Sequence, residues 1–462
     1  MWENIDKDRH YTGVFNIFGE DISGELIYNK KNGVILLNVA KNITDISSFG
    51  KSYSNTDVII GKLNTGAVVT LFNNRCTKNH TQAFRTQQLN YVAEYMVWSN
   101  HDATDSKYNK MICVLKNALS WSGLSMLDTS EPSVVKLKYN KNDNVYHWFG
   151  ATVSFSTNLN CGLFGFPREE ESKVVEHLVV EIETTVKQDV TCFMALRDKI
   201  ISLISFAIRD NVNIDEQYLQ DYEDSYEISD NVFEYYKHYL MSSESHLSTS
   251  SKNVWEYNFT LSQISPEKDI KDELSKLEPI FNLYLSLFKY RDMPREMVFL
   301  NIVQALETFH ARFFYDDKKE KYVASVIERF GGYSNFSEIE KLLLCDTQKD
   351  ENCKYIILVS RLNDLLIGEY DGLFYEYYGI DSNFAQTIAD TRHYYTHYGK
   401  PKEKKALKGD ALLDAIFVLT LLLEYNVCLK LGIDIRATIT QRLSNNEAWK
   451  QLEKESKKKL KK

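Results

Sequence analysis

The segment ADTRHYYTHYGK, residues 389–400, places an arginine and a histidine five positions apart within an aromatic run. Arg392 carries a planar, permanently charged guanidinium group that matches phosphate oxygens. His397 titrates near neutral pH and can serve as a general acid or base. Together they supply what cleavage of a phosphodiester needs without a metal: neutralisation of charge on the phosphate and transfer of a proton. RNA brings its own nucleophile, the 2′-hydroxyl group.

The spacing of these two residues limits how one helix can present them. Five positions correspond to roughly 140° around an ideal α-helix, so Arg392 and His397 do not share a face. Either the helix tightens or ends near Gly399 and Pro401, or two copies of the helix meet and pool their side chains. A symmetric dimer with one helix from each protomer along a cleft would gather two arginines and two histidines.

The neighbouring side chains suit supporting roles. His393 precedes His397 by four positions, so both rings can lie on one helix face. Because no third ligand stands out beside them, we predict neither a metal site here nor a cofactor. Three tyrosines, Tyr394, Tyr395 and Tyr398, are predicted to pack in the core or in a dimer interface. The alternative is that they stack on an RNA base.

Other common enzyme signatures are absent from the sequence. It contains no GxxxxGK[ST], no GxGxxG after a strand, no HExxH, no GxSxG and no cysteine or histidine spacing typical of a metal site. Seven cysteines are scattered without a CxxC pair, which indicates reduced thiols in a cytosolic protein. The segment MWENIDKDRHYTG at the N-terminus is too polar for a signal peptide. We therefore expect a cytoplasmic protein.

The composition is that of a soluble globular protein with material for more than one core. Of 462 residues, 44% are hydrophobic and 26% are charged, and the net charge is −9. Such a chain is not a general nucleic-acid binder, so an RNA substrate must meet a local basic site. The longest apolar run, 415–423, has about half the length of a bilayer crossing. It predicts a buried helix, and we expect no membrane association.

The first half of the chain shows strand patterns. Two apolar runs around an Asn-Gly or an Asn-Thr-Gly turn predict β-hairpins at 24–39 and 57–74. Further strands are predicted at 91–100, 151–166 and 174–185. We therefore expect a β-rich N-terminal region.

Helices are expected inside and after this region. Apolar residues at helical spacing predict helices over 108–123, ended by Gly123, and over 191–210. The acidic stretch 215–230 lacks the glycine and the ligand spacing of a calcium loop. We predict that it is solvated or faces basic side chains.

From about residue 265 to 432, nearly all of the apolar spacing is helical. Pro294 can sit at the start of a helix over 295–314 whose apolar residues mark one face. The sequence predicts an α+β multidomain protein, with a β-rich N-terminal region followed by an all-α helical bundle. We expect the β-rich region to span 1–260, with a possible break between two lobes near 125–150. The helical bundle is expected at 265–440, followed by a lysine-rich tail at 441–462.

The helical half resembles the HEPN family (higher eukaryotes and prokaryotes nucleotide-binding), whose members are helical ribonucleases. The motif TRHYYTH at 391–397 is similar to the Arg-polar-…-His motif of ApeA-type abortive-infection proteins. The segment FLNIVQALETFHARFF resembles an earlier helix of that family, with Glu307 and His310 at the positions of a QxLExxH pattern. His393 stands where asparagine is commoner, which leaves open whether His393 or His397 does most of the proton transfer. We favour His397, which holds the last position of the motif.

The N-terminal half extends this resemblance. YTGVFNIFGEDISGELIYNKKNGVILLNV is similar to the start of the ApeA N-terminal domain, and LKNALSWSG is similar to its later helix. The likeness covers 10–40, 105–123 and 295–430, whereas 125–260 matches only vaguely.

The resemblance implies an antiphage abortive-infection protein. Its HEPN domain would cleave RNA without a metal through attack of the 2′-oxygen, with Arg392 stabilising charge and His397 transferring the proton. The N-terminal region would sense a phage-derived protein trigger, and the HEPN domain would form a homodimer. Glu307 would orient Arg392 or order the cleft, and the alternative is a surface carboxylate paired with His310. The alternative function is a non-catalytic HEPN module for dimerisation or nucleotide binding, joined to a domain that recognises a phage component.

Overall fold

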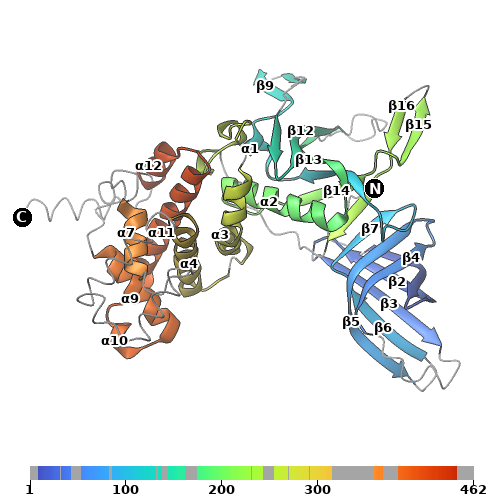
Figure 1. Cartoon of the computed structure of the whole chain (residues 1–462), viewed down its shortest axis with the longest axis horizontal. Coiled ribbons are helices and arrows are strands. Elements are labelled where there is room, and N and C mark those ends of the chain that lie inside the picture. Colours follow the sequence, from blue (N-terminus) through green and yellow to red (C-terminus); the bar gives the residue numbers. More distant parts are fainter. Residues whose placement is uncertain are drawn as a thin grey trace, which may run out of the picture. The chain divides into compact units, whose positions relative to one another are not determined.

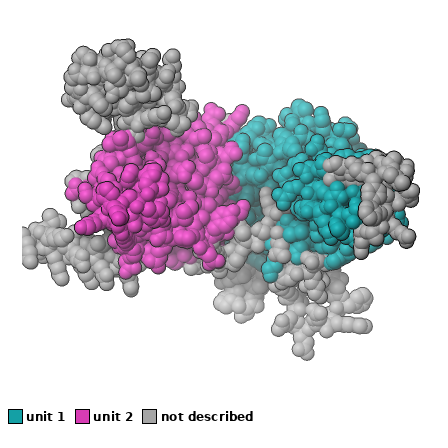
Figure 2. Space-filling view, turned by 90° about the horizontal axis from the view of Figure 1, so that it is seen from below, with its two compact units in different colours: residues 1–201, 212–251 teal, residues 202–211, 252–462 magenta. Residues whose placement is uncertain are grey.

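The structure of the chain is a computed structural model. It divides into two compact units, one of residues 1–201 and 212–251, the other of residues 202–211 and 252–462 (Figure 2). The residues that the structure describes are 9–31, 33–42, 54–82, 86–131, 134–137, 144–161, 174–229, 232–242, 254–268, 270–290, 292–314, 357–367 and 383–444.

The first unit is built on an antiparallel sheet of thirteen strands, in the order β11-β12-β13-β8-β14-β17-β7-β5-β4-β1-β2-β3-β6. Short two-stranded sheets are formed by β9 with β10 and by β15 with β16. The strands are β1 (Arg9–Ile17), β2 (Glu20–Asn29), β3 (Val34–Asn42), β4 (Thr56–Leu63), β5 (Val68–Gln82), β6 (Thr86–Val92), β7 (Tyr95–Ser99), β8 (Tyr108–Leu115), β9 (Leu127–Glu131), β10 (Val134–Leu137), β11 (Val145–Trp148), β12 (Ala151–Cys161), β13 (Val174–Gln188), β14 (Ile214–Gln220), β15 (Ser225–Ser229), β16 (Val232–Tyr235) and β17 (His238–Ser242).

Strands β1 to β6 close into a ring because β5 pairs with β6 as well as with β4 (Figure 1). Alternate side chains point inward and form a core that includes Phe15, Leu26, Leu37 and Leu71. Both predicted hairpins are confirmed, since β2 pairs with β3 and β4 pairs with β5. Gly66 adopts φ 88 in the second turn, a conformation that favours glycine.

Two sequence predictions in this unit are corrected. Residues 108–115 form strand β8, not a helix, and only α1 (Leu119–Ser122) is helical before Gly123 ends it at φ 68. Strand β8 lies between β13 and β14, and residues 111–115 are all buried. A continuous apolar run of this kind contains helical spacings by coincidence. The predicted strand at 91–100 is divided between β6 and β7.

The other predicted elements of this unit are present. Strands β12 and β13 match the runs at 151–166 and 174–185, with 162–166 outside the described residues. One of the two alternatives predicted for the acidic stretch 215–230 was that it faces basic side chains. Its first residue, Asp215, does so, at 2.7 Å from Lys30 and 3.0 Å from Lys116.

The second unit is helical, which confirms the predicted fold class. Helix α2 (Val190–Ile208) begins in the first unit and ends in the second. The predicted tail and its lysines lie outside the described residues from 445 on. The remaining helices are α3 (Lys271–Lys289), α4 (Arg295–Phe313), α7 (Leu358–Ile367), α9 (Phe384–His397), α10 (Lys400–Glu403), α11 (Gly409–Lys430) and α12 (Arg436–Ser444), with short 3₁₀ turns at η3 (Val254–Glu256) and η4 (Leu261–Gln263).

Helix α11 packs against α4, α7 and α12 in the second unit. By length and composition it is the one described helix that could cross a membrane, yet 67% of its apolar window is buried within the protein. Its Glu424 is fully buried and accepts hydrogen bonds from Tyr284, Arg209 and Arg442 at 2.6, 2.8 and 2.9 Å. A charged group with three protein partners is typical of a core helix.

Candidate active site

The arginine and histidine of the motif both lie on α9, and the helix ends at the histidine. His397 is the last residue of α9, and Tyr398 follows in the left-handed conformation with φ 49. Gly399 then caps α10, which carries Pro401 in its first turn. The structure thus shows the helix end that one of the two predicted alternatives requires, and the meeting of two copies of the helix stays a prediction.

Hydrogen bonds and an ion pair connect the C-terminal part of α9 to residues 402–407, which follow it in the chain. The hydroxyl of Thr391 is buried, accepts a hydrogen bond from the Leu407 amide at 3.1 Å and donates to the Thr387 carbonyl at 2.8 Å. The hydroxyl of Tyr395 donates to the Leu407 carbonyl at 2.8 Å. Lys402 forms an ion pair with Asp390, the residue before Thr391. These contacts fix the backbone on which Arg392 and His397 stand.

Arg392 is oriented by a carboxylate on a neighbouring helix. Its guanidinium lies 3.6 Å from Glu307 of α4, and the two side chains are 40% and 26% exposed. Burial raises the pKa of Glu307, and the charges of Arg392 and Arg361 act in the opposite direction. Arg361 of α7 is buried and donates to the Glu307 carbonyl at 3.2 Å. The arrangement holds Arg392 from one side and leaves part of its guanidinium open to solvent.

The histidine expected to pair with Glu307 in the alternative reading, His310, pairs with a different carboxylate. His310 is fully buried, and its Nε2 lies 2.9 Å from the Asp364 carboxylate on α7. It therefore joins α4 to α7 inside the bundle, while Glu307 faces Arg392.

The two histidines of the motif lie together at the exposed end of α9. The ring centroids of His393 and His397 are 4.8 Å apart, and both side chains are exposed. Arg392 contacts Glu307, whereas His397 contacts His393, so the two groups of the motif have different neighbours. This follows from their angular separation on the helix.

The three tyrosines of the segment have different surroundings. Tyr395 is buried and packs edge-on against Phe299, with ring centroids 6.2 Å apart. Tyr398 is 66% exposed, and its ring packs edge-on against Tyr394 at 5.5 Å. Lys408 places its Nζ 5.3 Å from the centre of the Tyr394 ring. An exposed aromatic surface with an adjacent cation therefore borders the two histidines.

Sequence reasoning did not single out two features of this site. Arg361 could not be assigned to the site from the sequence, because it lies 31 positions from Arg392 and belongs to no recognisable motif. The segment KPKEKKALK, residues 400–408, contains five lysines and one glutamate directly after the motif. Its charge was visible in the sequence and makes this segment locally basic in a chain of net charge −9.

Two protein-family models match the chain. The family model described as ApeA N-terminal domain 1 matches residues 10–271, and the model described as Apea-like HEPN matches residues 300–436. No curated protein and no solved structure matches the chain at a significant level. The first match alone spans more than half of the chain, and the second contains Glu307, Arg392 and His397. The chain therefore belongs to the ApeA family, with an ApeA N-terminal domain followed by an Apea-like HEPN domain.

Proposed function

We propose that this protein is an antiphage abortive-infection ribonuclease whose HEPN domain cleaves RNA without a metal ion. The observation that carries the proposal is the exposed end of α9. There, a guanidinium paired with Glu307 and the exposed pair His393 and His397 directly precede the lysines of residues 400–408 in the chain. The lysines attract the RNA backbone, the guanidinium binds the phosphate, and an imidazole moves the proton.

The reaction follows from these roles. The 2′-oxygen of the RNA attacks the adjacent phosphorus, and the bond from phosphorus to the 5′-oxygen breaks. Arg392 stabilises the negative charge that develops on the phosphate oxygens. His397 transfers the proton of the 2′-hydroxyl to the departing 5′-oxygen, and the products are a 2′,3′-cyclic phosphate and a 5′-hydroxyl end. His393 lies close enough to His397 to share this proton transfer.

The N-terminal half is proposed to control the HEPN domain in response to a phage-derived protein. We place this role in residues 1–260 and the catalytic role in residues 265–440. Helix α2 supports such a coupling, because it is one continuous helix that starts in the first unit and ends in the second. We propose that the protein acts in the cytoplasm, in keeping with free thiols at the described cysteines Cys76, Cys192 and Cys428.

The test of this function is a gel of cellular RNA before and after activation of the full-length protein. We expect discrete cleavage fragments with 2′,3′-cyclic phosphate ends, and we expect cleavage by the activated protein to persist when EDTA is added. The reason is that the proposed reaction uses only Arg392 and His397 and gives no role to a metal ion. Loss of cleavage in EDTA that magnesium or zinc restores would contradict the mechanism. Absence of any cleavage after activation would favour the non-catalytic dimerisation module.

The active unit is proposed to be a two-fold dimer formed through the HEPN helices. Arg392 and His397 diverge by roughly 140° on α9, so a two-fold axis beside this helix would bring Arg392 of one chain toward His397 of the other. The exposed ring of Tyr398 offers apolar area for such an interface.

Light scattering on the active species is expected to give twice the mass of the 53.7 kDa chain. Mixing Arg392→Ala chains with His397→Ala chains gives a second measurement. In a shared site, each mixed dimer has one intact site, so random mixing restores about a quarter of wild-type activity. If each chain works alone, mixing restores nothing. An active monomer would contradict the dimer.

A further inference from the structure

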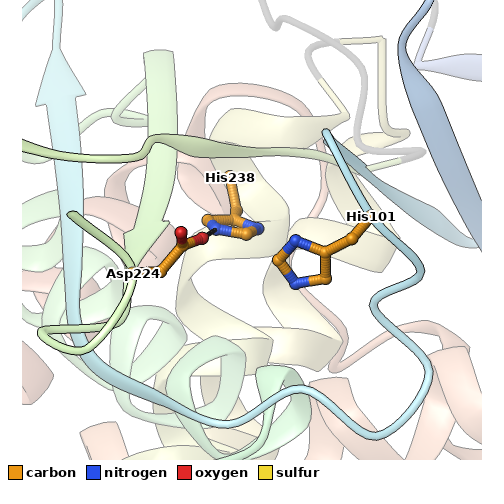
Figure 3. Close-up of side chains that lie close together, drawn as sticks. All are labelled: His101, Asp224 and His238. Carbon is orange, nitrogen blue, oxygen red and sulfur yellow. Dashed lines mark hydrogen bonds and ion pairs between the residues drawn. The ribbon is translucent and has the colours of Figure 1, made fainter. Parts of the chain in front are cut away.

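Three side chains with metal-binding chemistry meet in the first unit, far from the HEPN motif in the sequence. They are His101 in the loop between β7 and β8, Asp224 in the turn after β14, and His238 at the start of β17 (Figure 3). One ligand atom of each lies within 4.8 Å of the ligand atoms of the other two. Figure 3 shows the ring of His238 between the Asp224 carboxylate and the ring of His101.

His238 is the buried member of this cluster. Its side chain is 1% exposed, and its Nε2 lies 2.9 Å from Oδ2 of Asp224. The other ring nitrogen, Nδ1, is buried and has no hydrogen-bond partner. Because Nε2 faces the Asp224 carboxylate, it is the ring nitrogen that can bind one ion together with Asp224.

The surrounding structure holds the carboxylate in place. The Asp224 amide donates to the Asp221 carbonyl at 3.1 Å, and the Tyr236 amide donates to the Asp224 carbonyl at 3.0 Å. His238 lies opposite Leu219 in the pairing of β17 with β14. Both the turn and the strand are therefore fixed by backbone hydrogen bonds.

The second histidine stands on the solvent side of the cluster. The rings of His101 and His238 are 4.9 Å apart, and the Tyr108 ring packs edge-on against His238 at 5.2 Å. Nδ1 of His101 lies 2.7 Å from the side-chain oxygen of Asn100, a contact that steadies the ring as partners of metal-binding histidines do. His101 is exposed, so an ion can enter from this side.

We propose that His101, Asp224 and His238 bind one divalent transition-metal ion of the zinc class. Two imidazoles and one carboxylate are ligands that suit Zn²⁺, whereas Mg²⁺ and Ca²⁺ prefer oxygen ligands. Ligand atoms of a tetrahedral zinc site lie about 3.3 Å apart, so a small movement of the exposed His101 closes the site. A water molecule completes the coordination. The ion joins the loop after β7, the turn after β14 and strand β17.

This site is independent of the proposed RNA cleavage. It lies within residues 10–271, the ApeA N-terminal domain, whereas Arg392 and His397 lie in the HEPN domain. Addition of EDTA after activation tests the catalytic step, and direct metal binding tests the site formed by His101, Asp224 and His238.

The experiment measures metal bound by the full-length protein. The protein is stripped with EDTA, incubated with Zn²⁺ or Co²⁺, passed through gel filtration and analysed for metal content. We expect one ion per chain in the wild type. In His101→Ala and Asp224→Asn we expect affinity to fall by roughly 100-fold or more, because loss of a ligand exceeds the usual effect of a supporting residue. His101 is exposed, so its replacement leaves the fold intact.

The matched control is His10→Ala. His10 forms an exposed pair with Glu25 at 2.8 Å, which repeats the histidine–carboxylate contact on the surface. This variant is expected to keep one ion per chain and a rise of several degrees in melting temperature on adding Zn²⁺. Less than one ion in the wild type, or equal binding by His101→Ala, would overturn the site. An intense thiolate band in the Co²⁺ spectrum would assign the ion to cysteine instead and equally reject it.

Discussion

Arg392→Ala and His397→Ala are each expected to reduce RNA cleavage by at least about 100-fold, the size of effect usual for loss of a general acid or base or of a group that stabilises transition-state charge. Both variants are expected to remain folded. Arg392 is 40% exposed and its contact with Glu307 spans 3.6 Å, and His397 is exposed at the last position of α9. Removing an exposed polar side chain costs little stability. The measurement is cleavage of cellular RNA by activated protein, beside the melting temperature of each variant.

Two further variants make this result specific. Arg436→Ala removes an arginine of α12 whose side chain is 51% exposed, and it is expected to cleave as the wild type does. His393→Ala decides which imidazole transfers the proton, because its ring lies 4.8 Å from that of His397. Wild-type cleavage by either Arg392→Ala or His397→Ala would show that the assigned site is wrong. A greater loss in His393→Ala than in His397→Ala would exchange the roles of the two histidines.

Glu424→Ala is expected to destabilise the second unit by about 3–5 kcal/mol, the cost of breaking a buried ion pair from one side. Glu424 is fully buried and interacts with Arg209 and Arg442, which are 22% and 6% exposed. Its removal leaves their charges without this partner inside the protein. Tyr284 loses the acceptor of its hydroxyl as well. Urea unfolding followed by circular dichroism measures the change.

The control for this prediction is the same substitution on the surface. Glu403 is 51% exposed and lies 3.6 Å from Lys408, so Glu403→Ala is expected to change stability by less than about 0.5 kcal/mol. A loss of similar size in both variants would contradict a special role for the buried carboxylate. A stable Glu424→Ala protein would mean that water or other side chains satisfy the two arginines.

The Glu424 network also includes the end of helix α2. Arg209 follows the end of α2, Tyr284 lies on α3, and Arg442 lies on α12. Arg442 also donates to Asn258 at 2.8 Å, and the Asn258 amide donates to the Ala207 carbonyl at 2.7 Å. The end of the helix that leaves the first unit is thus anchored in the core of the second.

The sequence by itself determined the elements whose signals are local. A hairpin needs only alternating side chains and a turn, so the pairs at 24–39 and 57–74 were predictable. Helix α2 and helix α4 show their apolar spacing within one segment, and His397 ends α9 just before the predicted stop at Gly399. The same local character made TRHYYTH recognisable, because Arg392 and His397 belong to one stretch of chain.

Only the tertiary structure decided which distant groups meet. Strand β8 was predicted as a helix because its apolar run fits both periods, and its pairing with β13 and β14 settles the matter. Glu307 and Arg392 are 85 positions apart, and His101 and His238 are 137 positions apart. Residue spacing in the sequence therefore predicts neither contact. The choice between such partners depends on the free energy of burying charged and polar groups, which a folded core imposes and a local pattern does not contain.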